Sequence, residues 1–178
     1  MRKSDIVNMP IFFDRYIELV EDIDIIDALE QSKECLQSLN RSPYRVLANH
    51  SYAINKWTVN EVWQHIVDNE RIQAYRALRF ARMDNTPLPG YDEQRLASTS
   101  HANDRSFDSI IDELIVVRES TIQLYKSFHP STLQRTGICF NKEISVLALG
   151  FVIVGHQQHH LRVLEEKYLA KTVGYMKN

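Results

Sequence analysis

The chain has 178 residues and a formal net charge of −2, with 21 Lys and Arg against 23 Asp and Glu. This balance argues against a nucleic-acid-binding protein, because binding to a phosphate backbone requires an excess of surface cations. Hydrophobic residues make up 44% and charged residues 25%, as in ordinary globular domains, so disordered and collagen-like chains are excluded. The length is typical of one domain, which we expect to span residues 1–178.

The hydrophobic segments indicate no membrane partner. The longest apolar run without a charge is Val146–Gly155, which is too short for a transmembrane helix of about 20 residues. The N-terminal segment MRKSDIVNMPIFF lacks the long apolar stretch of a signal peptide.

Cys35 and Cys139 are far apart and form no CxxC motif. We therefore expect a cytoplasmic protein with two free thiols.

The first two predicted helices have clear boundaries. Residues 24–39 place their apolar side chains on one broad face, and Pro43 lies beyond their end. The second helix begins at Thr58-Val-Asn-Glu61, a capping box in which the hydroxyl and the carboxylate each accept a hydrogen bond from a free backbone N–H. It extends to about Met83, where the turn-forming segment DNTPLPG follows.

Two further helices follow a long connection at about residues 84–105, and long loops are often functional. The third predicted helix covers about residues 106–128 and ends at His129-Pro130, because a residue that precedes proline disfavours the helical conformation. The fourth covers about residues 145–169. Its first half is apolar on all sides, which indicates burial. Four helices of this length predict an all-α fold, a four-helix bundle.

The fourth predicted helix contains the segment Gly155-His-Gln-Gln-His-His160. His156 and His160 are separated by about 40° around the helix axis and share the face that should meet the core. Two histidines with this i, i+4 spacing can bind the same metal ion. The alternative is a pair of core histidines that hydrogen-bond to their neighbours, and the spacing leaves both interpretations open.

The second predicted helix carries four further candidates. His65 lies at the edge of its apolar face, where it could be a third ligand or a half-exposed side chain. Arg76 shares this stripe and could contact an anionic substrate or a Glu side chain of a neighbouring element. Glu70 lies near the centre of the apolar face, so it must be paired, hydrogen-bonded or protonated. We favour an ion pair for Glu70 over a role as general base, and the capping box accounts for Glu61, the other candidate.

Three segments resemble the DinB-like superfamily, which includes the YfiT-like proteins. They are KWTVNEVWQHIVDNE at residues 56–70, YRALRFARMDNTPLPGY at residues 75–91 and GHQQHHL at residues 155–161. They occur in the order found in that family, and the resemblance covers about residues 16–168. It implies an antiparallel four-helix bundle that binds a divalent metal through His65, His156 and His160. His159 would then be a neighbour of the ligands.

The resemblance also implies a homodimer that binds zinc or nickel, with iron or manganese as alternatives. Three neutral imidazoles leave an open position on the metal, as in catalytic sites. That position could take water or the thiolate of a low-molecular-weight thiol. The implied function is a metal-dependent hydrolase or thiol-dependent transferase with a small-molecule substrate. The alternatives are a stress-response protein that binds a metal or small ligand without catalysis, and a structural dimer without a metal.

Overall fold

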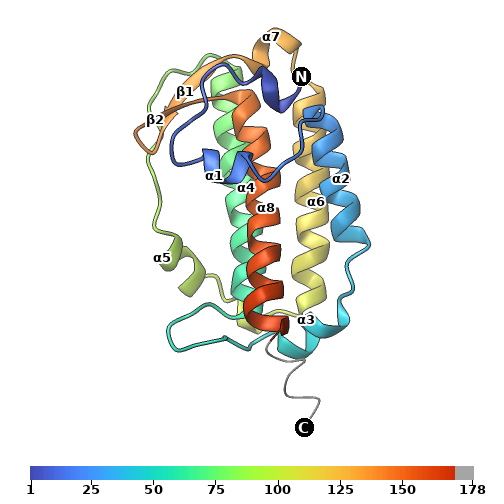
Figure 1. Ribbon diagram of the computed structural model, residues 1–178. Helices are drawn as coiled ribbons and strands as arrows, with labels where there is room; N and C mark the ends of the chain where they lie inside the picture. The colour runs from blue at the N-terminus through green and yellow to red at the C-terminus, as the bar shows by residue number, and fades with distance from the viewer. Residues whose placement is uncertain (171–178) are drawn as a thin grey trace.

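The computed structural model describes residues 1–170. Four long helices lie side by side along one axis (Figure 1). They are α2 (Ile25–Gln37), α4 (Val59–Ala81), α6 (Phe107–Lys126) and α8 (Val146–Val163). The predicted all-α four-helix bundle is therefore confirmed, and the expected helix ends lie within a few residues of the observed ones.

Shorter elements connect the long helices, and most of them were not expected from the sequence. Before α4 they are η1 (Lys3–Asp5), α1 (Asp14–Ile17) and α3 (Ser42–Leu47). Between α4 and α8 they are α5 (Glu93–Ser98), η2 (Ala102–Asp104), α7 (Pro130–Leu133), β1 (Thr136–Cys139) and β2 (Lys142–Ser145). A π-helical segment, η3 (Leu164–Leu169), continues α8, where the sequence predicted a regular helix.

Each long helix begins at a side-chain cap. The capping residues are Asp24, Thr58, Ser106 and Ser145, and each accepts a hydrogen bond from a backbone N–H of the first turn. The predicted capping box of α4 is confirmed, because the Thr58 N–H also donates to the Glu61 carboxylate at 2.7 Å. This cap fixes the start of α4 about two turns before His65.

The core consists of two hydrophobic clusters with a polar layer between them. The buried apolar side chains within residues 59–67 of α4 belong to one cluster, and those within residues 77–81 belong to the other. The buried side chains between these two stretches of α4 are polar: Asn69, Glu70, Gln73 and Arg76. Burying a polar group is costly unless it is paired. We therefore expect the functional site in and next to this polar layer.

The hairpin of β1 and β2 closes one end of the bundle. Its strands are antiparallel, and its turn contains Phe140 and Asn141, which both have positive φ angles. Leu88 of the long connection hydrogen-bonds to this hairpin, donating to the Ile138 carbonyl at 2.8 Å. Gly137 lies against Phe80 so closely that a Cβ there would clash with the ring. The hairpin thereby holds the connection near α4.

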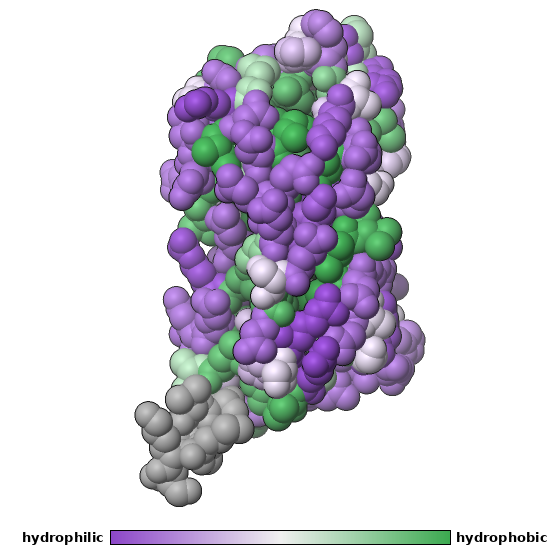
Figure 2. Space-filling model, turned by 90° about the vertical axis from the view of Figure 1, so that its right-hand side faces the viewer, coloured by the Kyte–Doolittle hydropathy of each residue, from purple (hydrophilic) through white to green (hydrophobic). Residues whose placement is uncertain are grey.

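The outer face of α2 and α6 is mostly hydrophilic, with smaller hydrophobic areas (Figure 2). Ion pairs join these two helices, with Lys33 at 2.7 Å from Glu119 and Lys126 at 2.8 Å from Glu30. Among the described residues, no helix combines the length and the apolar character needed to cross a membrane.

Candidate metal centre

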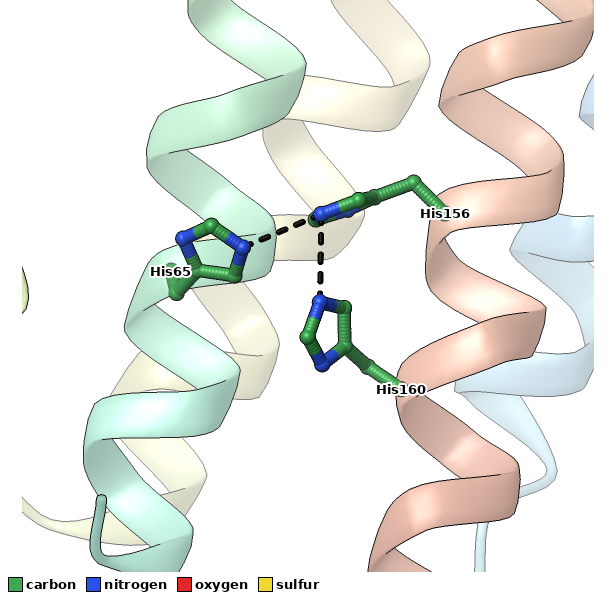
Figure 3. A group of neighbouring side chains, drawn as sticks. All are labelled: His65, His156 and His160. Atoms are coloured by element: carbon green, nitrogen blue, oxygen red, sulfur yellow. Dashed lines mark hydrogen bonds between the residues drawn. The ribbon is translucent and has the colours of Figure 1, made fainter. Parts of the chain in front are cut away.

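Three histidines converge between α4 and α8. The Nε2 atom of His156 lies 3.0 Å from Nε2 of His65 and 3.1 Å from Nε2 of His160. All three rings point toward the space between the two helices (Figure 3). One nitrogen from each ring lies within 4.8 Å of the others, and in residues 1–170 no other group of His, Cys, Asp and Glu has this arrangement.

These imidazoles are buried and neutral. His65 is 4% exposed, His156 is 2% exposed and His160 is partly buried. Burial, with a smaller effect of His159, lowers the pKa of His65 to about 4. Burial and the neighbouring histidines also lower the pKa values of His156 and His160 far below the usual range. At neutral pH each ring therefore keeps a lone pair available for a metal ion.

The geometry fits a divalent transition metal. Nitrogens at about 2.0–2.1 Å from a tetrahedral zinc ion lie about 3.3 Å from one another. The observed Nε2 separations of 3.0 and 3.1 Å are close to this value. Imidazole suits zinc, copper, iron and nickel, whereas calcium and magnesium prefer oxygen ligands. The third separation, between the nitrogens of His65 and His160, is at most 4.8 Å, so the three histidines can hold such an ion after an adjustment of these two rings.

Aromatic side chains hold the histidine rings in place. The Tyr16 ring meets His156 edge to face at a centroid distance of 5.2 Å. The centroid of the Trp57 ring lies 4.7 Å from that of His65. Tyr16 comes from α1, and no sequence signal indicated that this short helix would reach the site. Both rings pack directly against histidines of the cluster.

The other sequence candidates lie outside the cluster. Glu70 forms a bidentate ion pair with Arg118, with N–O distances of 2.8 and 2.9 Å. Glu61 accepts its hydrogen bond within the capping box. We therefore assign structural roles to both carboxylates. His159 is partly exposed, and its ring lies next to Tyr16 and His160.

A cavity of about 350 Å³ adjoins His156. One wall comes from α4 and α8, with Asn69, Gln73, Arg76 and Val152. The long connection contributes residues 90–94. The remaining walls were missed from the sequence. They consist of residues around α1 and the hairpin turn, namely Phe12, Phe13, Arg15, Tyr16 and Phe140.

A sequence model of the DinB superfamily matches residues 29–164 of this chain. The chain belongs to the DinB superfamily. This DinB-superfamily protein is similar in structure to YfiT from Bacillus subtilis, described as a probable metal-dependent hydrolase with an unusual four-helix bundle topology. The TM-score is 0.62 over 91% of this chain and 87% of that chain, with 16% sequence identity. A comparison with curated proteins found no match.

Proposed function

We propose that this protein is a metal-dependent enzyme that acts on a small molecule, as a hydrolase or as a thiol-dependent transferase. The observation that carries this proposal is the convergence of His65, His156 and His160 beside a cavity. The proposed ligands are these three histidines, and the proposed ion is zinc or nickel. A divalent ion bound there supplies Lewis-acid chemistry. The resemblance to YfiT, described as a probable metal-dependent hydrolase, is consistent with this proposal.

The residues around the ligands have defined tasks in this proposal. Burial keeps the three imidazoles neutral, so they bind a cation without first losing a proton. Tyr16 and Trp57 pack against the rings of His156 and His65 and restrict their orientation. The cavity beside His156 gives a small substrate access to the ion.

One observation favours the second candidate, a protein that binds a metal or small ligand without catalysis. In the part of the chain that the structure describes, no ion pair joins His65, His156 or His160 to a carboxylate. Glu61 and Glu70 are both engaged elsewhere. The site therefore has no carboxylate in direct contact with the histidines that could serve as a general base.

Metal content tests the proposed ligands. Protein purified without a metal-binding tag should contain one divalent transition-metal ion per chain by mass spectrometry. His65→Ala, His156→Ala and His160→Ala should each remove it. His159→Ala is the matched control, because its partly exposed ring is a neighbour of the cluster and should leave the metal in place. Absence of metal after reconstitution, or equal loss in all four variants, would contradict the proposed site.

Turnover separates the enzyme from the binding protein. Hydrolysable esters and amides, and low-molecular-weight thiols paired with an electrophile, are the substrates to screen. Activity should disappear after chelation, return with added metal and be absent in His65→Ala. A metal-loaded protein with no turnover across this screen would support binding without catalysis.

Assembly and location complete the proposal. From the family resemblance we propose a cytoplasmic homodimer. Light scattering of the purified protein should give twice the mass of the chain, and a monomer at all concentrations would refute this.

A further inference from the structure

One buried arginine in the cavity has no acidic partner. Arg76 is 3% exposed, and its guanidinium donates to the Gln73 side-chain oxygen at 3.2 Å and to the Pro89 carbonyl at 2.8 Å. Both acceptors are neutral. By contrast, the buried Arg118 is paired with Glu70, whereas no ion pair in residues 1–170 includes Arg76. A buried charge is costly unless an opposite charge offsets it.

The position of Arg76 relates it to the metal centre. Arg76 follows His65 by eleven residues on the same helix, which corresponds to about 16 Å along the axis. Asn69 and Gln73 lie between them and line the same cavity, together with Val152 and His156 of α8. The cavity therefore extends from the histidine cluster toward the guanidinium. Its volume of about 350 Å³ lies in the range of small-molecule sites.

A second polar group in the cavity also lacks a partner. Asn69 is 4% exposed, and its Nδ2 donates to the Tyr91 hydroxyl at 2.6 Å. Its Oδ1 atom is buried and accepts no hydrogen bond from any described residue. Because buried polar atoms are normally satisfied, this oxygen can accept a hydrogen bond from a donor group of a bound molecule.

The remaining charged groups that line the cavity, Arg15, Asp92 and Glu93, are exposed. Arg15 is exposed, donates to the Tyr16 hydroxyl and lies over the Phe12 ring. Asp92 caps α5 by accepting from the Arg95 N–H at 3.0 Å. Burial raises the pKa of Glu93, and the charge of Arg15 opposes this effect. Among these groups, Arg76 is the charged side chain that is both buried and without a counterion.

We propose that the cavity binds a small organic carboxylate, which pairs with Arg76. Two of the five guanidinium N–H groups are used by Gln73 and Pro89, so others remain for a carboxylate. The apolar body of the ligand lies among Tyr91, Val152 and the aromatic side chains of the cavity, and its far end approaches His156. This inference rests on the proposed function and names the substrate class of that site.

Binding to the metal-free protein tests the proposal independently of the metal. Phenylacetate and its neutral analogue phenylacetamide are titrated by calorimetry into protein treated with a chelator. Phenylacetate should bind at least about tenfold more tightly than the amide, since the charged pair forms only with the carboxylate. Arg76→Gln should remove this preference. Arg82→Gln, at an exposed arginine that follows α4, is the matched control and should retain it.

A second variant guards against a loss of structure in Arg76→Gln, because Arg76 also holds the Pro89 carbonyl. Asn69→Asp leaves Arg76 in place and adds a carboxylate inside the cavity. It should weaken phenylacetate binding by about tenfold or more relative to amide binding, since only the acid is repelled by the added charge. A thermal melt of each variant confirms that it is folded.

Several results would overturn the proposal. They are equal affinities for the acid and the amide, no binding of either to the metal-free wild type at millimolar concentration, and no effect of Arg76→Gln and Asn69→Asp. Binding of phenylacetate only after zinc is added would also overturn it, because the carboxylate would then bind the metal. Since the assay uses metal-free protein, absence of a native metal would refute the proposed function without changing this result.

Discussion

Gly155 of α8 lies directly against the backbone of Tyr16, so that a Cβ at position 155 would be 1.9 Å from the Tyr16 carbonyl oxygen. Glycine inside a helix costs about 1 kcal/mol relative to alanine. Here it permits α1 to approach α8 and to place the Tyr16 ring beside His156. A glycine that weakens the helix locally thus positions one wall of the metal centre.

Gly155→Ala should therefore destabilise the protein, although alanine favours helices. We expect a net loss of about 1–3 kcal/mol in the free energy of unfolding, because the clash is with backbone that must move. Urea denaturation measures this loss, and metal affinity should fall as α1 shifts. Gly150→Ala is the control. Its Cβ would meet side-chain atoms only, Ile25 Cδ1 at 2.7 Å and Tyr125 Cε1 at 2.8 Å, and no backbone, so its cost should be smaller than that of Gly155→Ala. A stabilised Gly155→Ala would contradict the role of this contact.

The Glu70–Arg118 pair should contribute to stability rather than to catalysis. Its side chains are 2% and 0% exposed, so Glu70→Gln leaves a buried guanidinium without its counterion and should cost about 3–5 kcal/mol. Denaturation measures the loss, while metal content should remain unchanged if the variant folds. Glu119→Gln, which breaks a surface pair with Lys33, should cost at most about 1 kcal/mol.

A double variant separates the contribution of the Glu70–Arg118 ion pair to stability from that of side-chain packing. Glu70→Leu combined with Arg118→Met should be less destabilised than the sum of the two single variants, because neither charge is then left alone. Additive losses would show that Glu70 and Arg118 do not act as a pair.

Metal removal should leave the fold intact. Two hydrophobic clusters stabilise the bundle without the histidines, so the helical circular dichroism of the chelated protein should match that of the loaded protein. Zinc at about 100 times its dissociation constant should add about 2.7 kcal/mol to the free energy of unfolding. Thermal melts with and without zinc measure the shift. His156→Ala should show none, and unfolding on chelation would contradict this prediction.

Acid should weaken the connection between α3 and α6. Hydrogen bonds from Arg45 and Arg41 lower the pKa of Asp108 below its usual value of 3.8. As the pH falls, the Asp108 carboxylate is therefore protonated in the unfolded chain before it is protonated in the folded protein. The stabilisation is fully present above pH 3.8 and is lost as the pH falls through the lower pKa of the folded state. Asp108→Asn should lower the melting temperature at pH 6, and this difference should shrink as the pH falls below 3.8.

Salt provides the control for this pH effect. Because Asp108 and Arg45 are exposed, high ionic strength should reduce the difference between wild type and Asp108→Asn. A difference that persists unchanged at low pH or at high salt would show that the carboxylate acts through packing instead of charge.

The parts of the fold that are set by residues close together along the chain could be predicted from the sequence. The capping box at Thr58 and Glu61 placed the start of α4, and the spacing of apolar residues located the four long helices. The hairpin was missed, because two four-residue strands give too short a pattern to recognise. Its turn at Phe140 and Asn141 lacks the glycine that usually marks such turns.

The candidate site was predictable in part for the same reason. His156 and His160 share a helix face because they are one turn apart, and this follows from helix geometry alone. His65 lies 91 residues from His156, and its inclusion depended on the family resemblance. Glu70 was recognised as a paired buried group, but its partner Arg118 was not, since many cations of the sequence could have reached it.

The sequence by itself therefore determined the helices, their caps and the spacing of the histidine pair, because these depend on hydrogen bonds and side-chain periodicity within a few residues. Only the tertiary structure decided that His65 meets His156, that Tyr16 closes the site against Gly155, and that Arg76 faces a cavity without a counterion. These relationships depend on how α1, α4 and α8 pack, and such packing joins surfaces that are far apart along the chain.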